Sequence, residues 1–245
     1  MEKELIIALV AATVAVFSAV SSIVCQLRIA SLNRQHEIEK RRHDQTQNAA
    51  LYTEPLARSA ADLQSRIYNI VKMGFIGRFY LNGTEREKRY VVANTAFLFA
   101  QFLAWTEAAR LEVQYISLEL DEDTQALSAA QSKIYSILQT DDYPPLLRIF
   151  AGEQRAIGER MLKFSSNRFS CMGYGEFLDC NGLDSDALFQ ELANDITELG
   201  NKLQNARPRL VALQHGLIDL IDTLDKKRIR FPEAERTKIA LLSDE

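Results

Sequence analysis

The segment YVVANTAFLFAQFLAWTEAARLEVQYISLEL, residues 90–120, carries apolar side chains on nearly every face from Val91 to Trp105. A helix that is apolar all round has to be buried, as is typical of the central element of a helical bundle. A membrane span is the alternative, but this run is interrupted and closed by polar residues, namely Asn94, Thr95, Gln101, Glu107 and Arg110. We therefore predict an all-α body with this helix at its centre.

Helical patterns flank the central helix on both sides. Thr84 and Glu87 have the spacing of a capping box, which predicts that the helix opens just after the Asn82-Gly83 turn. Apolar residues recur at helical spacing in five further segments: 55–74, 123–138, 146–164, 184–199 and 208–224. Residues 164–183 lack that period and predict a long loop or a small hairpin. The pattern predicts a bundle of about five to six helices over residues 54–230, followed by a mobile tail at 231–245.

A second apolar run, LIIALVAATVAVFSAVSSIVCQL, occupies residues 5–27 without a charge or a proline. Its 23 positions are long enough to cross a bilayer as a helix, and longer than the apolar core of a signal peptide, the alternative. The sequence predicts a tail and single transmembrane helix within residues 1–27, continuing into a polar helical stem at 28–53. Basic residues follow the run, which places the N-terminus outside and the body in the cytoplasm, at the plasma (inner) membrane.

The body after the stem has the length of one domain and an acidic balance. Residues 51–245 hold 23 Lys and Arg against 28 Asp and Glu, a net charge of −5. This balance argues against a nucleic-acid partner held by diffuse positive charge. Cys25, Cys171 and Cys180 are too few for a disulfide framework, so we expect reduced thiols.

Small side chains form a stripe along the predicted span, and they recur at alternating three- and four-residue steps: Ala8, Ala11, Ala12, Ala15, Ser18, Ala19 and Ser22. Such stripes let helices approach closely in lipid and favour a homo-oligomer, although alanine and serine are also common in spans. The same register passes through His36 and His43. Without a known metal spacing around them, ordinary solvated histidines are favoured over a pH or zinc site.

Basic residues gather near the stem and near the end of the last helix: Lys40, Arg41, Arg42, Lys226, Lys227, Arg228 and Arg230. They could meet anionic lipid headgroups, which makes the bilayer a predicted partner. The alternative is a solvated helix end whose cations are favourable to the helix dipole.

Polar residues lie within otherwise apolar helices and define a candidate polar network: Gln64, Arg66, Glu107, Arg110, Gln154 and Arg155. Buried charges have to be paired, so these residues predict either a structural network or a polar ligand pocket, and the structural role is favoured. Glu107 and Arg110 can pair within one helix because they are three residues apart.

The remaining patterns give no catalytic, cofactor-binding or metal-ligating residues. His215 with Cys171 or Cys180 could form a nucleophile and base, but a helix-packing or surface role is favoured for His215 and a buried apolar role for the cysteines. The aspartates at 219, 222 and 225, and the acidic run 121–123, fit solvated faces better than a calcium loop. The G-x-G at residues 173–175 lacks the strand and helix of a nucleotide site.

Three segments, EPLARSAADLQSRIYNI, FLAWTEAARLEVQYISL and GEQRAIGERML, are similar to uncharacterised, mostly bacterial proteins with a helical body that is sometimes membrane-anchored. The resemblance covers residues 54–162 and implies a helical body, but no activity, substrate or cofactor.

The sequence favours a membrane-anchored helical protein for interaction, sensing or scaffolding, without catalytic activity. One alternative is an effector that perturbs the membrane after oligomerising through its span. Another is an enzyme with an unrecognised polar site.

Overall fold

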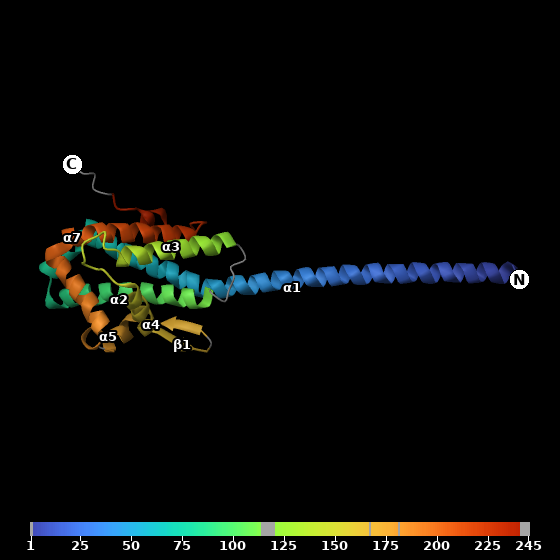
Figure 1. The fold of residues 1–245 in the computed structure, drawn as a ribbon, viewed down its shortest axis with the longest axis horizontal. Helices are drawn as coiled ribbons and strands as arrows, with labels where there is room; N and C mark the ends of the chain where they lie inside the picture. The colour runs from blue at the N-terminus through green and yellow to red at the C-terminus, as the bar shows by residue number, and fades with distance from the viewer. Residues whose placement is uncertain (1, 114–120, 167, 181, 241–245) are drawn as a thin grey trace. The chain divides into compact units, whose positions relative to one another are not determined.

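A computed structural model describes residues 2–113, 121–166, 168–180 and 182–240. The chain divides into two compact units, Met1–Gln47 and Asn48–Glu245. In chain order the elements are α1 (Glu2–Lys72), the π-helix η1 (Gly77–Leu81), α2 (Glu85–Val113), α3 (Asp121–Gln139), α4 (Ala151–Met161), β1 (Leu162–Ser165), β2 (Arg168–Cys171), α5 (Tyr174–Asp179), α6 (Gly182–Ser185), α7 (Ala187–Leu224) and the 3-10 helix η2 (Glu233–Arg236) (Figure 1). The predicted helical character is confirmed, with one short hairpin added.

Helix α1 corrects two expectations about the N-terminal region. It is continuous through Pro55, where the sequence predicted that a separate helix would begin. Among the residues that the structure describes, no helix combines the length, sustained hydropathy and scarcity of charge that a bilayer span needs. The apolar run at 5–27 is instead part of a 71-residue helix that continues with exposed side chains through Lys40. The predicted transmembrane anchor, the single-pass topology and the inner-membrane localisation are therefore not supported.

The core of the second unit forms around α2, as the sequence predicted. Helices α4, α5 and α7 and strand β2 all contact α2. Phe99 and Phe102 of α2 are buried, as are Leu63 and Ile67 of α1 and Leu217 of α7. Burying each such side chain contributes about 1.5–3 kcal/mol, so the contact between these helices is the main source of stability.

Individual residues explain where α2 begins and how closely α4 packs against it. Before α2, the backbone N–H of Thr84 donates to the Glu87 carboxylate at 2.7 Å and the Glu87 N–H donates to the Thr84 hydroxyl at 3.4 Å, which confirms the capping box. In α4, Gly158 permits close packing on α2. A Cβ atom at Gly158 would lie 2.8 Å from the Leu103 carbonyl oxygen.

Helix α7 joins two segments that the sequence predicted as separate helices. It bends at Lys202, whose backbone leaves the helical region (φ −125°, ψ 25°), and Figure 1 shows the change of direction between its orange and red-orange parts. Pro208 lies inside the helix, six residues after the bend. Proline removes a hydrogen bond and its ring meets the carbonyl four residues earlier, here residue 204, which weakens the helix just after the bend.

Strands β1 and β2 form an antiparallel hairpin within the segment predicted to be a long loop or a small hairpin. Phe164 lies opposite Phe169, and the centroids of their rings are 4.9 Å apart. This cross-strand pair stabilises the hairpin, and Phe169 also packs against the core.

Residues 231–240, the C-terminal strap, pack against α1 and α7 within the second unit, in contrast to the mobile tail that was expected. Phe231, Arg236 and Ile239 are buried. The expectation failed because the anchors of this segment are contacts with residues far away in the sequence, which helical periodicity does not register. Residues 241–245 lie outside the described part of the chain.

Candidate binding sites

The strap begins with a sharp change of chain direction that Asp225 holds at the end of α7. Its carboxylate accepts the backbone N–H groups of Ile229 and Arg230 at 3.1 Å and that of Phe231 at 3.2 Å. Arg228 within this turn has a positive φ of 52°. Burial disfavours the ionised form of Asp225, but the three N–H donors and Arg236 outweigh that effect and hold its pKa below the usual value.

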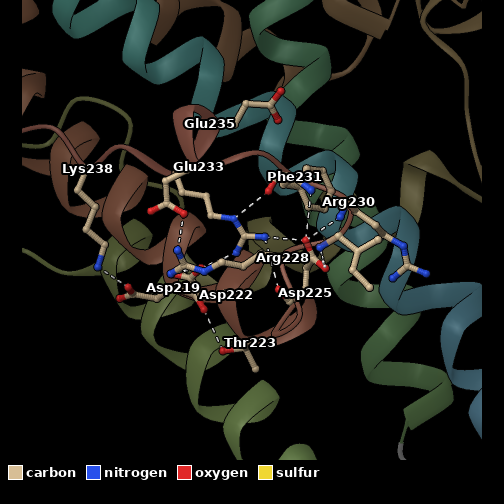
Figure 2. A network of polar contacts seen from close by, with 12 residues as sticks. Asp219, Asp222, Thr223, Asp225, Arg228, Arg230, Phe231, Glu233, Glu235 and Lys238 are labelled. Carbon is tan, nitrogen blue, oxygen red and sulfur yellow. Dashed lines mark hydrogen bonds and ion pairs between the residues drawn. The ribbon is translucent and has the colours of Figure 1, made fainter.

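Arg236 ties the strap back to the same end of α7. Its guanidinium is buried and forms ion pairs with Asp222 and, at 2.6 Å, with Asp225. It also donates to the Phe231 carbonyl at 3.2 Å. Figure 2 shows the aspartates of α7 facing the residues of the turn and strap. A buried guanidinium with two carboxylates and a carbonyl is well satisfied, so this corner of the strap is firmly fixed.

Side chains of α1 and α7 bind the backbone of the strap at alternate residues. Gln64 donates to the Glu235 carbonyl at 2.8 Å. Gln214 donates to the Thr237 carbonyl at 2.8 Å and accepts the Ile239 N–H at 3.2 Å. His215 Nε2 lies 2.7 Å from the Ile239 carbonyl oxygen, which can only accept, so Nε2 carries the hydrogen. We call Gln64, Gln214, His215, Asp222 and Asp225 the strap-binding surface.

Asp219 extends the polar contacts of the strap to α3. Its carboxylate accepts from Lys133 of α3 at 2.8 Å and also pairs with Lys238 of the strap. Burial acts against ionisation of Asp219, but the two lysines outweigh it and lower its pKa. Protein cations thus occupy the acidic face of α7. Among the described residues no group of three His, Cys, Asp or Glu could hold a metal ion.

The six residues of the predicted polar network do not form one network. Gln64 belongs to the strap-binding surface, and Arg66 contacts the side chains of Tyr90 and Asn94 in α2. Gln154 is buried and donates to the Ile149 carbonyl at 2.8 Å. Arg155, in contrast, is exposed. The six positions therefore serve separate parts of the bundle.

Glu107 and Arg110 pair within α2 in the way their spacing suggested. Arg110 Nε donates to the buried Glu107 carboxylate at 2.8 Å, and this bond raises the pKa of Arg110. The Tyr135 hydroxyl of α3 lies close enough for Glu107 to influence it, but burial is the larger cause of its raised pKa. A buried carboxylate with its own arginine is a structural arrangement.

The other predicted site residues are only partly described. Of the small-residue stripe, the side chains of Ser18 and Ser22 are exposed, whereas those of Ala8, Ala11, Ala12, Ala15 and Ala19 lie outside the described residues, as do those of Arg41, Arg42 and His43. His36 is exposed, and its Nδ1 atom lies 3.9 Å from the Oε2 atom of Glu39.

The basic residues that follow α7 are all exposed, and Arg228 and Arg230 contact carboxylates. Arg228 pairs with Glu233, and Arg230 lies 3.6 Å from Glu54 of α1. Lys226 and Lys227 are exposed, as is Lys40 near the stem. Two of the cations that were expected to meet lipid headgroups therefore have protein carboxylates as partners.

The cysteines and His215 lie in different segments of the chain. Cys25, Cys171 and Cys180 are free thiols, and burial raises the pKa of Cys171 to about 12. His215 contacts the strap instead. A thiol with so high a pKa is a poor nucleophile at neutral pH.

Sequence reasoning missed Gln214, Arg236, Tyr90 and Asn94 as site residues. The sequence did contain one signal for Gln214 as a site residue: Gln214 and His215 are consecutive polar residues within the apolar pattern of α7. Comparison of the chain with family models, curated proteins and solved structures found no match.

Proposed function

We propose that the second unit is a non-catalytic interaction module that binds an extended peptide segment on its strap-binding surface, with the C-terminal strap as the occupant within the same chain. One observation carries the proposal. The Gln214 amide pairs with both the Thr237 carbonyl and the Ile239 N–H, which are the groups that a neighbouring β-strand would engage.

Backbone contacts of this kind accept many sequences, so the buried side chains of the strap would supply specificity. Its anchors are Phe231, Arg236 and Ile239. A competing segment would place an aromatic residue, then an arginine five positions later, then an aliphatic residue three positions after that. The aspartates at 222 and 225 select for the arginine, because a neutral residue there would leave two carboxylates without their partner.

The strap acts as an intramolecular competitor. A tethered segment has an effective concentration on the order of millimolar, so a partner has to bind considerably more tightly than an untethered copy of the strap. Loosening the strap should therefore increase the affinity for a peptide supplied in solution.

The experiment uses the full-length chain and a fluorescent peptide with the sequence of residues 231–240, FPEAERTKIA. The double variant Arg236→Gln/Ile239→Asp removes two anchors and should bind the peptide at least tenfold more tightly than the unmodified chain, measured by fluorescence anisotropy. The double variant Glu235→Gln/Ala240→Ser changes exposed positions of the same strap and should behave like the unmodified chain.

Two further measurements test the surface itself. Adding Gln214→Ala to the loosened variant should abolish binding, and a scrambled peptide should not bind. If the loosened variant keeps its circular dichroism spectrum and melting behaviour but fails to bind FPEAERTKIA, the proposal is wrong. Equal binding of the scrambled peptide would also contradict it.

A further inference from the structure

A pocket separate from the strap-binding surface lies at the turn between α1 and α2. It has a volume of about 430 Å³ and is lined by Phe75, Phe79, Thr84, Arg86, Glu87 and Tyr90. Pockets of this size hold small organic ligands. The lining combines three aromatic rings with two charged side chains.

The turn holds this lining in a fixed position. Gly74 ends α1 with a φ of +67°, and the π-helix η1 follows. Gly83 packs closely against the backbone of Phe79, and a Cβ atom at Gly83 would be 2.1 Å from the Phe79 carbonyl oxygen. The ring centroids of Phe75 and Phe79 are 5.3 Å apart. Short π-helical segments are frequent at functional sites; this one carries Phe79, and Phe75 precedes it by two residues, so both rings line the pocket.

Arg66 of α1 lies behind the aromatic wall. Its Cζ atom is 4.2 Å from the centroid of the Phe75 ring and 5.4 Å from that of the Tyr90 ring. Its Nη2 donates to the Asn94 side chain and, at 3.3 Å, to the Tyr90 hydroxyl. Arg66 is 8% exposed, and its buried Nη1 has no hydrogen-bond partner.

In the described part of the chain, Arg66 contacts two aromatic rings, an amide and a hydroxyl, but no carboxylate. Buried cations are ordinarily paired with an anion, because a charge that is removed from water and left uncompensated destabilises the fold. The carboxylate in the pocket lining, that of Glu87, is already engaged. It accepts the N–H of Thr84 at 2.7 Å and the Thr84 hydroxyl at 2.8 Å, and the backbone bond in particular lowers its pKa.

These charges favour an anion in the pocket and disfavour a cation. The faces of Phe75 and Tyr90, which would attract a cationic ligand, already interact with Arg66. Arg86 adds a second positive charge to the lining. The Tyr90 oxygen accepts from Arg66, so its own hydrogen remains available to donate to a ligand.

We propose that this pocket binds a small aromatic carboxylate. The flat ring packs against Phe75 and Phe79, and the carboxylate accepts hydrogen bonds from the Tyr90 hydroxyl and from Arg86. Arg66 is a positioning residue, which orients the Tyr90 hydroxyl and supplies a positive field from behind the wall. This site is independent of the strap-binding surface.

The test compares three probes that share one ring system: 2-naphthoate, 2-naphthamide and 2-naphthylmethylamine. Each is titrated into the full-length chain and followed by amide NMR shifts and calorimetry. The carboxylate should bind saturably at submillimolar concentration, at least tenfold more tightly than the amide or the amine, and shift residues 75–90.

Variants separate this binding from general apolar adsorption. Tyr90→Phe keeps the ring and removes the hydroxyl, and it should weaken 2-naphthoate binding about tenfold without unfolding the chain. Arg86→Gln should weaken it as well. Arg89→Gln removes an exposed arginine that does not line the pocket, and it should leave the affinity unchanged.

Four outcomes would overturn the proposal. These are equal affinity for all three probes, tighter binding of the amine, shifts centred outside residues 75–90, and no saturable binding of 2-naphthoate at millimolar concentration. An equal effect of Arg86→Gln and Arg89→Gln would likewise remove the carboxylate site, because it would show that only the overall charge of the helix matters.

Discussion

The side-chain amide of Gln214 donates to the side-chain oxygen of Gln64 at 3.3 Å, across 150 positions of sequence. The pair joins α7 to α1, and each glutamine also binds the backbone of the strap. Two buried amides thus satisfy each other and the strap together, so a change at either one exposes polar groups in several segments.

Replacing Gln214 with alanine should lower the free energy of unfolding by about 2–4 kcal/mol, because the groups it bonds at residues 64, 237 and 239 would be left buried without a partner. Urea denaturation measures this change. Gln204→Ala, at an exposed position of the same helix, should change it by less than about 0.5 kcal/mol. Similar values for the two variants would show that the strap is not held through Gln214.

Acid should loosen the strap through Asp225. Its backbone donors and Arg236 outweigh burial and hold its folded-state pKa below the unfolded value of about 3.9. The contribution of this carboxylate to stability is therefore fully present above that unfolded pKa and is lost as the pH falls through the lowered folded pKa.

The stability of the chain should accordingly decline below about pH 4, measured as urea midpoints over a pH series. Asp225→Asn should be less stable at pH 7 and should show a shallower decline in acid. Asp141→Asn, at an exposed position, serves as the control and should follow the unmodified chain. An unaltered acid decline in Asp225→Asn would assign the effect to other carboxylates.

The close approach of α4 to α2 should not tolerate a methyl group at residue 158. In Gly158→Ala the new Cβ atom would lie 2.8 Å from the Leu103 carbonyl oxygen and 3.2 Å from the Glu107 Cβ atom. We expect a loss of about 1–3 kcal/mol in stability, because the helices have to separate. Gly152→Ala in the same helix meets nothing within 4 Å and should be neutral or stabilising. Thermal melts of the two variants provide the comparison.

Arg209 should be among the most sensitive side chains of the bundle. It is buried in α7 and donates to the carbonyls of Leu138 at 3.1 Å, Thr140 at 3.0 Å and Pro144 at 3.2 Å. Arg209→Met should cost about 3–5 kcal/mol, because several buried carbonyls at the end of α3 would lose their donor. Arg155→Met, at an exposed site, should cost less than about 0.5 kcal/mol in the same denaturation assay.

The three thiols should differ in reactivity. Burial raises the pKa of Cys171 to about 12, whereas Cys25 and Cys180 are exposed. With iodoacetamide at pH 8, we expect alkylation of Cys25 and Cys180 but not of Cys171, followed by mass spectrometry of the digested peptides. Fast alkylation of Cys171 in the folded chain would show that its thiol is not shielded.

The sequence predicted what depends on neighbouring residues. The cap formed by Thr84 and Glu87 and the pairing of Glu107 with Arg110 involve residues three positions apart. The apolar character of residues 91–105 likewise predicted the burial of α2. Each of these signals lies within one helix, where spacing determines which side chains meet.

What the sequence did not predict depends on distant residues. The strap contacts its surface across 171 positions in the case of Gln64, and no periodic pattern carries such a partnership. Arg66 was identified as a polar residue in an apolar helix, but its neighbours Tyr90 and Phe75 come from other segments. The anchor prediction is not supported, because no helix among the described residues has the length and sustained hydropathy of a bilayer span.

The order of the strap contacts has a mechanical consequence. Starting from Ala240, the chain meets Gln214 and His215 at residue 239, Gln214 again at 237, Gln64 at 235 and finally the carboxylate of Asp225 at the turn. A pulling force applied at that end would act on these bonds one after another rather than on all of them together. The strap should therefore detach one contact at a time up to the corner held by Arg236, while the helices beneath it, whose contacts share any load across many side chains, stay packed.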